Sequence, residues 1–321
     1  MRRIDPIYVA AGIAILLGSA IEYFRPDVGY GEAIGLLFYE PVCEAPPICT
    51  VPPEREFGVE YYGLIYTGNT SNLIDQRVLC LGAWEKHILH FLGQTAESLS
   101  EKRGELTFVD VGANTGLHSL FMSRRVAEVH AFDLYQPVVE KMSHNVERND
   151  LKNITIYAVG LGDRAARLPF VAPPKDNQGT GSFMPGDEKT DLQLQIVRGD
   201  AYFADHEIDR VDIMKVDVEG FEKPVLLGLK DTLVESRPVI VFEITVESEG
   251  ADHLFRSQEE LEAALPPDYR LFSFAEWDAM TGFYQLGPLE VDFATEAYQW
   301  DTVAAPAELV YLLPRSAEPS W

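Results

Sequence analysis

The sequence has few cysteines and few basic residues. Three cysteines in 321 residues are too few for the disulfide framework of a small secreted domain. Lysine and arginine number 26 against 51 aspartates and glutamates, which gives a formal net charge of -25. Because a surface this negative repels phosphate backbones, we expect no nucleic acid partner.

Internal repeats and low-complexity tracts are also absent, and the chain is not polar enough to be disordered. Hydrophobic residues make up 46% of the sequence and aromatic residues 11%, which is ample for a sizeable core. These proportions predict one domain of catalytic size with shorter segments attached to it.

Charge is missing from residues 6–21, a run that directly follows a stretch containing Arg2 and Arg3. As a helix this run would be about 24 Å long, shorter than the roughly 30 Å hydrocarbon core of a bilayer. A membrane anchor therefore competes with a signal peptide and with a soluble core helix. We favour an uncleaved helix at residues 1–24 that binds a membrane or a membrane-protein complex.

Residues 25–57 are rich in proline and glycine and lack a sustained hydrophobic period. They predict a linker or an extended arm, because proline fixes φ and removes a hydrogen-bond donor. Cys43 and Cys49 flank a short loop in this segment. Two interpretations stay open, a disulfide in an oxidising compartment and two free thiols.

Beyond residue 57, short apolar runs alternate with amphipathic segments. We divide this part into 58–104 with a hairpin over 58–79 (turn at 67–71) and a helix over 83–99, a core over 105–245, and a C-terminal extension over 246–321 with closing strands at 269–274 and 308–313. The expected core strands are 106–111, 128–133, 154–159, 209–218 and 238–244, and the expected helices are 117–125, 136–150 and 223–236. This alternation predicts a Rossmann-like α/β fold with a doubly wound, mostly parallel sheet.

The first core strand leads into a loop that reads D-x-G-x-N-x-G from Asp110 to Gly116. Ligands of such sheets lie beyond the carboxyl ends of the strands. Gly112 and Gly116 permit a tight turn against a ligand, and Asn114 offers polar contacts. The loop is neither G-x-G-x-x-G nor a P-loop. It is similar to the first motif of class I S-adenosylmethionine methyltransferases.

Acidic residues also follow the second and third core strands. Asp133 can accept hydrogen bonds from both hydroxyls of a cofactor ribose, although an aspartate at this place alone is more often a helix cap. Asp163 can accept from the amino group of an adenine, or it belongs to a simple Gly-Asp turn. We include both among the candidate cofactor-binding residues.

Five segments together resemble the FkbM methyltransferase family: VDVGANTGLHSL, VHAFD, AVGLGD, IMKVDVEGFEKPVLLGL and PVIVFEI. The resemblance spans about residues 58–313 and includes both marks of the family, DVGAN-x-G and K-[IV]-D-V-E-G-x-E. It implies an O-methyltransferase that uses S-adenosylmethionine and acts on a hydroxyl of a sugar, glycolipid, polyketide or related small molecule. It also implies that the element at 82–85 closes over the cofactor, with Glu85 among the cofactor-binding residues.

Transfer of a methyl group to an alcohol requires a group that takes the hydroxyl proton. Asp217, Glu219 and Glu243 follow or end the fourth and fifth core strands, and strand alternation would put Asp217 and Glu219 on one face. Several acids in one crevice should raise at least one pKa, which suits a base or a divalent metal. We expect Asp217 nearest the methyl group and Glu219 or Glu243 as base or acceptor ligand, and we assign no metal ligand. In the alternative interpretation these acids only cap helices or pair with lysines such as Lys215.

Two further features remain open. His118 contacts the cofactor or the acceptor, or it is simply structural at the start of a helix. The glycine-rich segment at 173–185 is long enough to form a lid over the acceptor.

The N-terminal helix and the family resemblance predict different cellular locations for the catalytic domain. Arg2 and Arg3 favour a cytoplasmic N-terminus, so a spanning helix would place the domain outside, where S-adenosylmethionine is not expected. We therefore expect a membrane-associated protein whose catalytic domain is cytoplasmic. The alternatives are an inactive structural or accessory subunit of a membrane complex with the methyltransferase fold, and a secreted binding protein.

Overall fold

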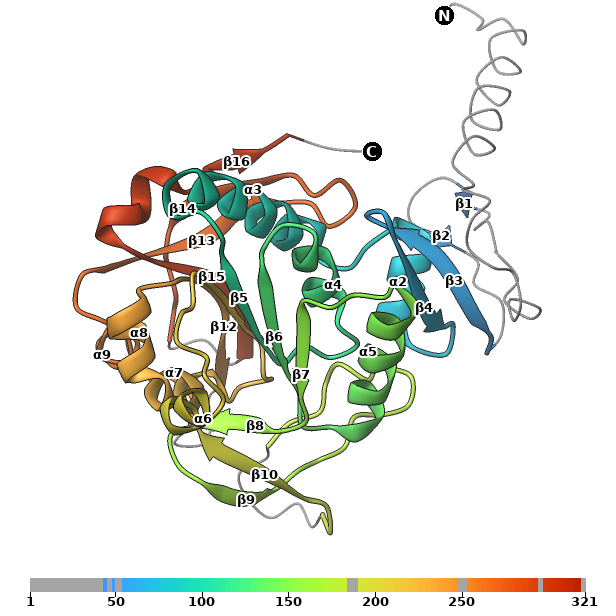
Figure 1. Cartoon of the computed structure of the whole chain (residues 1–321), viewed down its shortest axis with the longest axis horizontal. Helices are drawn as coiled ribbons and strands as arrows, with labels where there is room; N and C mark the ends of the chain where they lie inside the picture. The colour runs from blue at the N-terminus through green and yellow to red at the C-terminus, as the bar shows by residue number, and fades with distance from the viewer. Residues whose placement is uncertain are drawn as a thin grey trace, which may run out of the picture. The chain divides into compact units, whose positions relative to one another are not determined.

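The computed structural model describes residues 54–183, 190–247, 253–293 and 297–318, together with the backbone of two short strands at 43–44 and 48–49 (Figure 1). The helices are α2 Leu73–Leu81, α3 Lys86–Arg103, α4 Leu117–Ser123, α5 Gln136–Arg148, α6 Gly199–Asp205, α7 Glu222–Gly228, α8 Lys230–Ser236 and α9 Gln258–Ala263, with a 3-10 helix, η1, at Ala307–Leu312. The strands are β1 Cys43–Glu44, β2 Ile48–Cys49, β3 Glu56–Tyr61, β4 Leu64–Asn69, β5 Thr107–Val111, β6 Glu128–Phe132, β7 Ile154–Tyr157, β8 Gly160–Gly162, β9 Ala166–Pro169, β10 Gln193–Arg198, β11 Ile213–Val216, β12 Val239–Glu247, β13 Tyr269–Trp277, β14 Tyr284–Pro288, β15 Ala297–Pro306 and β16 Ser316–Ala317.

A nine-stranded sheet organises the domain, in the order β16-β14-β13-β15-β12-β11-β5-β6-β7. The strands from β12 to β7 in this order pair in parallel, whereas β15 joins β12 antiparallel. The chain order reverses between β5 and β11, which is the place where open α/β sheets bind ligands. The predicted Rossmann-like, mostly parallel fold is confirmed.

Two apolar clusters cover the two faces of this sheet. Consecutive residues of one strand point to opposite faces, so Phe108 belongs to one cluster and Val109 to the other. The first cluster includes buried side chains of α3, α4 and α5, and the second includes those of α6, α7 and α8 (Figure 1). The sheet is therefore wound on both faces, and its edge at the carboxyl ends of the strands is left for a site.

The predicted hairpin is displaced along the chain. Its turn lies at Tyr62 and Gly63, which both have positive φ (50° and 81°), between β3 and β4. A two-residue turn of this kind matches the twist of an antiparallel pair. The segment expected as the second strand is instead helix α2, because Asn72 caps it by accepting a hydrogen bond from the backbone N–H of Asp75.

The C-terminal extension also differs from the expectation. The strand expected at 269–274 is β13, but it pairs in the sheet with β14 and β15, and the segment expected as a strand at 308–313 forms η1. Pro306 ends the β15 ladder, since proline has no N–H to donate. A small sheet in the order β8-β10-β9, which the sequence did not predict, lies beside the end of β7.

The predicted membrane localisation is contradicted. Within the described ranges no helix is both long enough and apolar enough to cross a bilayer. The longest of them, α3, has 18 residues, but these include several charged side chains. The apolar run expected at residues 1–24 lies outside the described residues.

The structure describes the three cysteines only in part. Backbone pairing between β1 and β2 places Cys43 opposite Cys49. Cys80, in α2, is disulfide-bonded. The side chains of Cys43 and Cys49 lie outside the described residues, so both interpretations of this pair stay predictions.

Candidate active site

A cavity of about 270 Å³ lies where the strand order reverses, beyond the carboxyl ends of β5 and β11. Of the candidate residues from the sequence, those in its lining are Glu85, Gly112, Asn114, Asp133, Asp217, Glu219 and Glu243. Asp110, Gly116 and Asp163 are not among the lining residues. The structure thus brings together most of the predicted residues from five separate segments of the chain.

The glycine loop after β5 is shaped by the protein's own backbone. Gly112 has φ 83°, and a Cβ placed there would lie 1.7 Å from the carbonyl oxygen of Asp217. Gly116 has φ 85°, and a Cβ would lie 2.8 Å from the Met142 side chain. Gly112 is therefore needed for close packing against the residue that follows β11, whatever ligand the loop binds.

Asp133 holds the glycine loop and also faces the cavity. One carboxylate oxygen accepts from the N–H of Asn114 and the other from that of Tyr135, each at 2.9 Å. Burial raises the pKa of Asp133 to about 6, although these hydrogen bonds favour the ionised form. Each carboxylate oxygen has a second lone pair, so the side chain can still accept from ribose hydroxyls.

Two predicted cofactor residues lie elsewhere. Asp163 pairs with Arg164, at 3.2 Å, outside the cavity lining. Asp110 is 1% exposed and accepts a hydrogen bond from the Ser119 hydroxyl at 2.6 Å. Asp110 therefore supports the glycine loop from the buried side, through α4. Asp163 does not reach a ligand in this cavity.

Glu85 enters the cavity from the turn before α3, where it has φ 48°. Its pKa is raised first by burial, with Asp217 adding to the shift and Lys215 opposing it. Its Oε2 lies 3.4 Å from Nε2 of His118, but neither atom has a hydrogen-bond partner among the described residues. Burial and then Lys215 lower the pKa of His118 well below its ordinary value, so its imidazole is neutral.

These contacts test whether S-adenosylmethionine fits the site. Asn114 Oδ1 and Glu85 Oε2 are buried without hydrogen-bond partners among the described residues, and both residues line the cavity. Buried polar atoms in this state are costly, so a bound group that donates to them stabilises the site. An ammonium and ribose hydroxyls supply such donors, and the residues present therefore fit this cofactor.

Asp217 begins the acidic part of the cavity. Strand β11 ends at Val216, and the N–H of Asp217 still donates to the carbonyl of Val111 at 2.9 Å. Its Oδ2 lies 2.6 Å from Nζ of Lys215, whose side chain is 4% exposed. Burial alone would lower the pKa of Lys215, but Asp217, Glu85 and Asp110 reverse this and raise it. The pairing with Lys215 considered from the sequence is therefore present.

Glu219 reaches the cavity through a turn, and strand alternation is not the reason. It has φ 53° and precedes Gly220 with φ 90°, both past the end of β11. Glu222 holds this turn, because its Oε1 accepts from the N–H groups of Val218 at 2.8 Å and Gly220 at 3.3 Å. Burial, with Asp217 adding to the shift, raises the pKa of Glu219 to about 7 and that of Glu222 to about 8.

Glu243 faces these residues from β12. Its Oε2 accepts from Nε2 of Gln299 at 2.8 Å, and its pKa is raised by burial and then by Asp217, Glu222 and Glu219. Carboxylate oxygens of Asp217, Glu222 and Glu243 all lie within 4.8 Å of one another. Three carboxyl groups this close share protons or require a cation, as expected for acids in one crevice.

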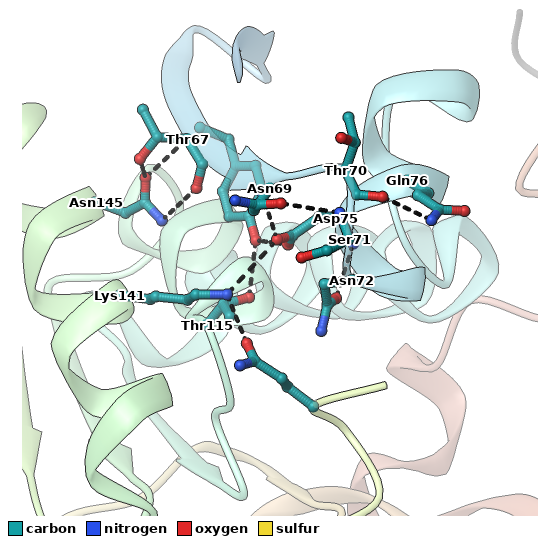
Figure 2. Close-up of polar contacts among 12 residues, drawn as sticks. Thr67, Asn69, Thr70, Ser71, Asn72, Asp75, Gln76, Thr115, Lys141 and Asn145 are labelled. Atoms are coloured by element: carbon teal, nitrogen blue, oxygen red, sulfur yellow. Dashed lines mark hydrogen bonds and ion pairs between the residues drawn. The ribbon is translucent and has the colours of Figure 1, made fainter. Parts of the chain in front are cut away.

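A buried network supports the other side of the glycine loop (Figure 2). The carboxylate of Asp75 accepts from the Tyr66 hydroxyl at 2.6 Å and from the N–H of Asn69 at 2.8 Å. The same hydroxyl lies 2.9 Å from Oγ1 of Thr115, which belongs to the glycine loop, and Nζ of Lys141 lies 3.8 Å from Asp75. The network joins the N-terminal hairpin and α2 to the cofactor side of the cavity.

The predicted lid contributes to the wall of the cavity. Its lining residues include Pro173 and the stretch 177–181. The N–H of Leu73 donates to the carbonyl of Asp176 at 2.8 Å, and Nζ of Lys141 donates to Oε1 of Gln178 at 2.5 Å. Residues 184 and 185 of the segment lie outside the described ranges. The segment is thus attached to α2 and α5 in this structure, and its opening stays a prediction.

Sequence reasoning missed Gln299 and Lys141. Gln299 reaches the site only because β15 pairs with β12, where it lies opposite Thr245 and two positions from the partner of Glu243. Lys141 belongs to an amphipathic helix and resembles any exposed lysine in the sequence. No local signal distinguishes either residue, because both depend on contacts between distant segments.

Comparison with known proteins agrees with the fold and the motifs. The model of the methyltransferase FkbM domain matches residues 110–280. The chain is 31% identical to Methyltransferase sdnD of Sordaria araneosa, covering 38% of this chain and 60% of that protein. It is 28% identical to the hexuronic acid methyltransferase AglP of Haloferax volcanii, covering 44% of this chain and 58% of that protein. The chain thus spans about three fifths of the length of each relative.

A solved methyltransferase FkbM from Methylobacillus flagellatus has 17% sequence identity and a TM-score of 0.40, covering 62% of this chain and 43% of that one. The assignment does not depend on this distant similarity. Because the domain match at 110–280 includes more than half of the 321 residues, this chain belongs to the FkbM methyltransferase family.

Proposed function

We propose that this protein is an S-adenosylmethionine-dependent O-methyltransferase that acts on a hydroxyl of a sugar or another small molecule. The observation that carries the proposal is one cavity with a glycine loop at one side and Asp217, Glu219 and Glu243 at the other. The names of the relatives support methyl transfer, and one of them is a hexuronic acid methyltransferase.

Cofactor binding is assigned to the glycine-loop side. Asp133 accepts from the ribose hydroxyls, the backbone around Gly112 and Asn114 surrounds the amino-acid end, and Glu85 accepts from its ammonium group. When bound, the cofactor supplies a methyl group on a positively charged sulfur. The acidic lining stabilises that positive charge before transfer.

The acceptor hydroxyl is assigned to the acidic side. Glu219, with a pKa of about 7, accepts a proton near neutral pH, and Glu243 lies close enough to share this task. Asp217 is held by Lys215 and orients the hydroxyl beside the transferred methyl group. These groups shift the proton from the acceptor oxygen as its new bond to carbon forms.

Calorimetry with S-adenosylhomocysteine tests the cofactor assignment, and transfer of a radiolabelled methyl group to a panel of hydroxyl compounds tests the reaction. Binding in the micromolar range and labelling of at least one compound are expected. Absence of binding would favour the structural or accessory subunit. Activity lost with a chelator and restored by Mg²⁺ would show that Asp217, Glu222 and Glu243 hold a cation.

A further inference from the structure

The charges of the cavity lining restrict the acceptor. Five carboxyl groups line the cavity, from Glu85, Asp133, Asp217, Glu219 and Glu243. Against them stand one ammonium group, that of Lys215, and one imidazole, that of His118. In the described lining no other lysine, arginine or histidine is present. The side of the cavity that faces the acceptor is therefore strongly acidic.

The single ammonium group is not available to a ligand. Nζ of Lys215 lies 2.6 Å from Oδ2 of Asp217, and its side chain is 4% exposed. Glu85 and Asp110 also interact with it. A carboxylate or phosphate on the acceptor would have to displace Asp217 from this pair, which would leave another buried charge without a partner.

The imidazole cannot act as a cation either. The side chain of His118 is 8% exposed, and its Nε2 has no hydrogen-bond partner in the described part of the chain. Its neutral ring can bond to a hydroxyl, which both donates and accepts. His118 is thus a buried, unpartnered group in the lining that points to a ligand with hydroxyl groups.

The neighbouring strand adds to the negative charge. Asp301 lies opposite Glu243 in the β12–β15 pair and raises the pKa of both Glu85 and Glu243. Gln299, in the lining, offers a neutral amide that already donates to Glu243. Carboxylates and an amide accept hydrogen bonds from several hydroxyls at once, whereas an anion adds like charge in a partly desolvated site.

From this geometry we infer that the acceptor is a neutral polyol, such as a neutral sugar, and that sugars with a carboxylate or phosphate near the reacting hydroxyl are excluded. The inference rests on the methyltransferase function proposed above and refines its substrate class. The inferred acceptor therefore differs from a hexuronic acid, the class of compound in the name of the Haloferax volcanii relative.

The test uses the full-length protein saturated with S-adenosylhomocysteine. Saturation-transfer NMR measures binding of methyl glycosides of glucose, galactose and mannose, each beside the uronate of the same stereochemistry. At least one neutral glycoside should bind, and its uronate should bind at least about tenfold more weakly at low salt. Added salt should narrow this difference, because it screens the repulsion.

Charge-removing variants locate the effect. Glu243→Gln and Glu219→Gln should each reduce, by severalfold, the difference in affinity between the neutral glycoside and its uronate. Glu101→Gln makes the same side-chain change at an exposed position of α3 outside the cavity lining, and it should leave the difference in affinity unchanged. Two cavity variants are used so that the test survives if one of them fails to fold.

Some outcomes would overturn the inference while leaving the proposed function intact. These are a uronate that binds as tightly as its neutral partner, a protein that binds S-adenosylhomocysteine but none of the neutral glycosides, or a difference that neither cavity variant narrows. Failure to bind S-adenosylhomocysteine at all would instead overturn the proposed function.

Discussion

At the scale of single residues, Asp133 and Asp163 occupy similar places in the sequence but different places in the molecule. Asp133 lines the cavity, and Asp163 pairs with Arg164 outside it. We expect Asp133→Ala to weaken S-adenosylhomocysteine binding by about 2–4 kcal/mol, because two charge-assisted hydrogen bonds are lost. Asp163→Ala should leave the affinity unchanged. Calorimetry measures both affinities. Equal losses of affinity would mean that Asp163 also contributes to cofactor binding.

A second residue-scale prediction concerns Gly112. A Cβ there would overlap the carbonyl oxygen of Asp217, so Gly112→Ala should lower the free energy of unfolding by about 3 kcal/mol or more. Gly82 has nearly the same φ, 82°, but a Cβ added there would have no atom within 4 Å of it. Gly82→Ala should therefore cost only about 1 kcal/mol. Denaturant unfolding measures the free energy of unfolding of both variants. Similar losses would show that the positive φ, and not the contact with Asp217, determines the cost.

At the scale of elements, the turn after β11 determines where Glu219 lies. Glu222→Gln and Glu222→Leu both remove a buried carboxyl group, but only glutamine keeps an oxygen that can accept from Val218 and Gly220. The leucine variant should be less stable than the glutamine variant by about 1–3 kcal/mol, the usual cost of buried donors without partners. Equal stability in urea would mean that Glu222 does not hold the turn.

The β12–β15 pairing and the lid are the other elements that complete the site. Antiparallel pairing brings Gln299 to Glu243, and Lys141 attaches the lid segment through Gln178. Both contacts join segments far apart in sequence. The cavity wall therefore depends on the C-terminal extension and on the N-terminal α2 as much as on the Rossmann-like core.

At the scale of the whole molecule, the buried acids determine how stability changes with pH. Glu219 and Glu222 have pKa values of about 7 and about 8, above the ordinary value of 4.5. Between about pH 6.5 and 8 the folded protein therefore binds protons that the unfolded chain has released, so stability falls as pH rises. The slope is at most about 1.4 kcal/mol per pH unit for each group. Histidines with lowered pKa values, such as His118, oppose this only below about pH 6.5.

Guanidinium unfolding is unsuitable for this measurement because it adds salt, so urea titrations at pH 6.5, 7.2 and 8 are the direct check. Glu222→Gln should flatten the slope. Moderate NaCl should raise stability at every pH, since the chain has a formal net charge of -25. A free energy of unfolding that rises with pH in this window would contradict the raised pKa values.

Local patterns in the sequence were enough for the fold class, the family and seven residues of the cavity lining. Alternating apolar runs and helices predict a parallel sheet, and in such a sheet the ends of neighbouring strands meet at one edge. For this reason the sequence alone indicates Gly112, Asp133, Asp217 and Glu243 as candidate site residues. Their roles in binding and catalysis stay predictions.

Tertiary contacts decided the rest. The hairpin turn depends on positive φ at Tyr62 and Gly63, and the N-cap at Asn72 replaced an expected strand by a helix. Glu219 enters the cavity through a turn held by Glu222, and Gln299 enters through strand pairing. A sequence pattern indicates which residues of a segment are buried. The features named here depend instead on which other segments, far away in the sequence, pack against it. Only the packed structure contains that information.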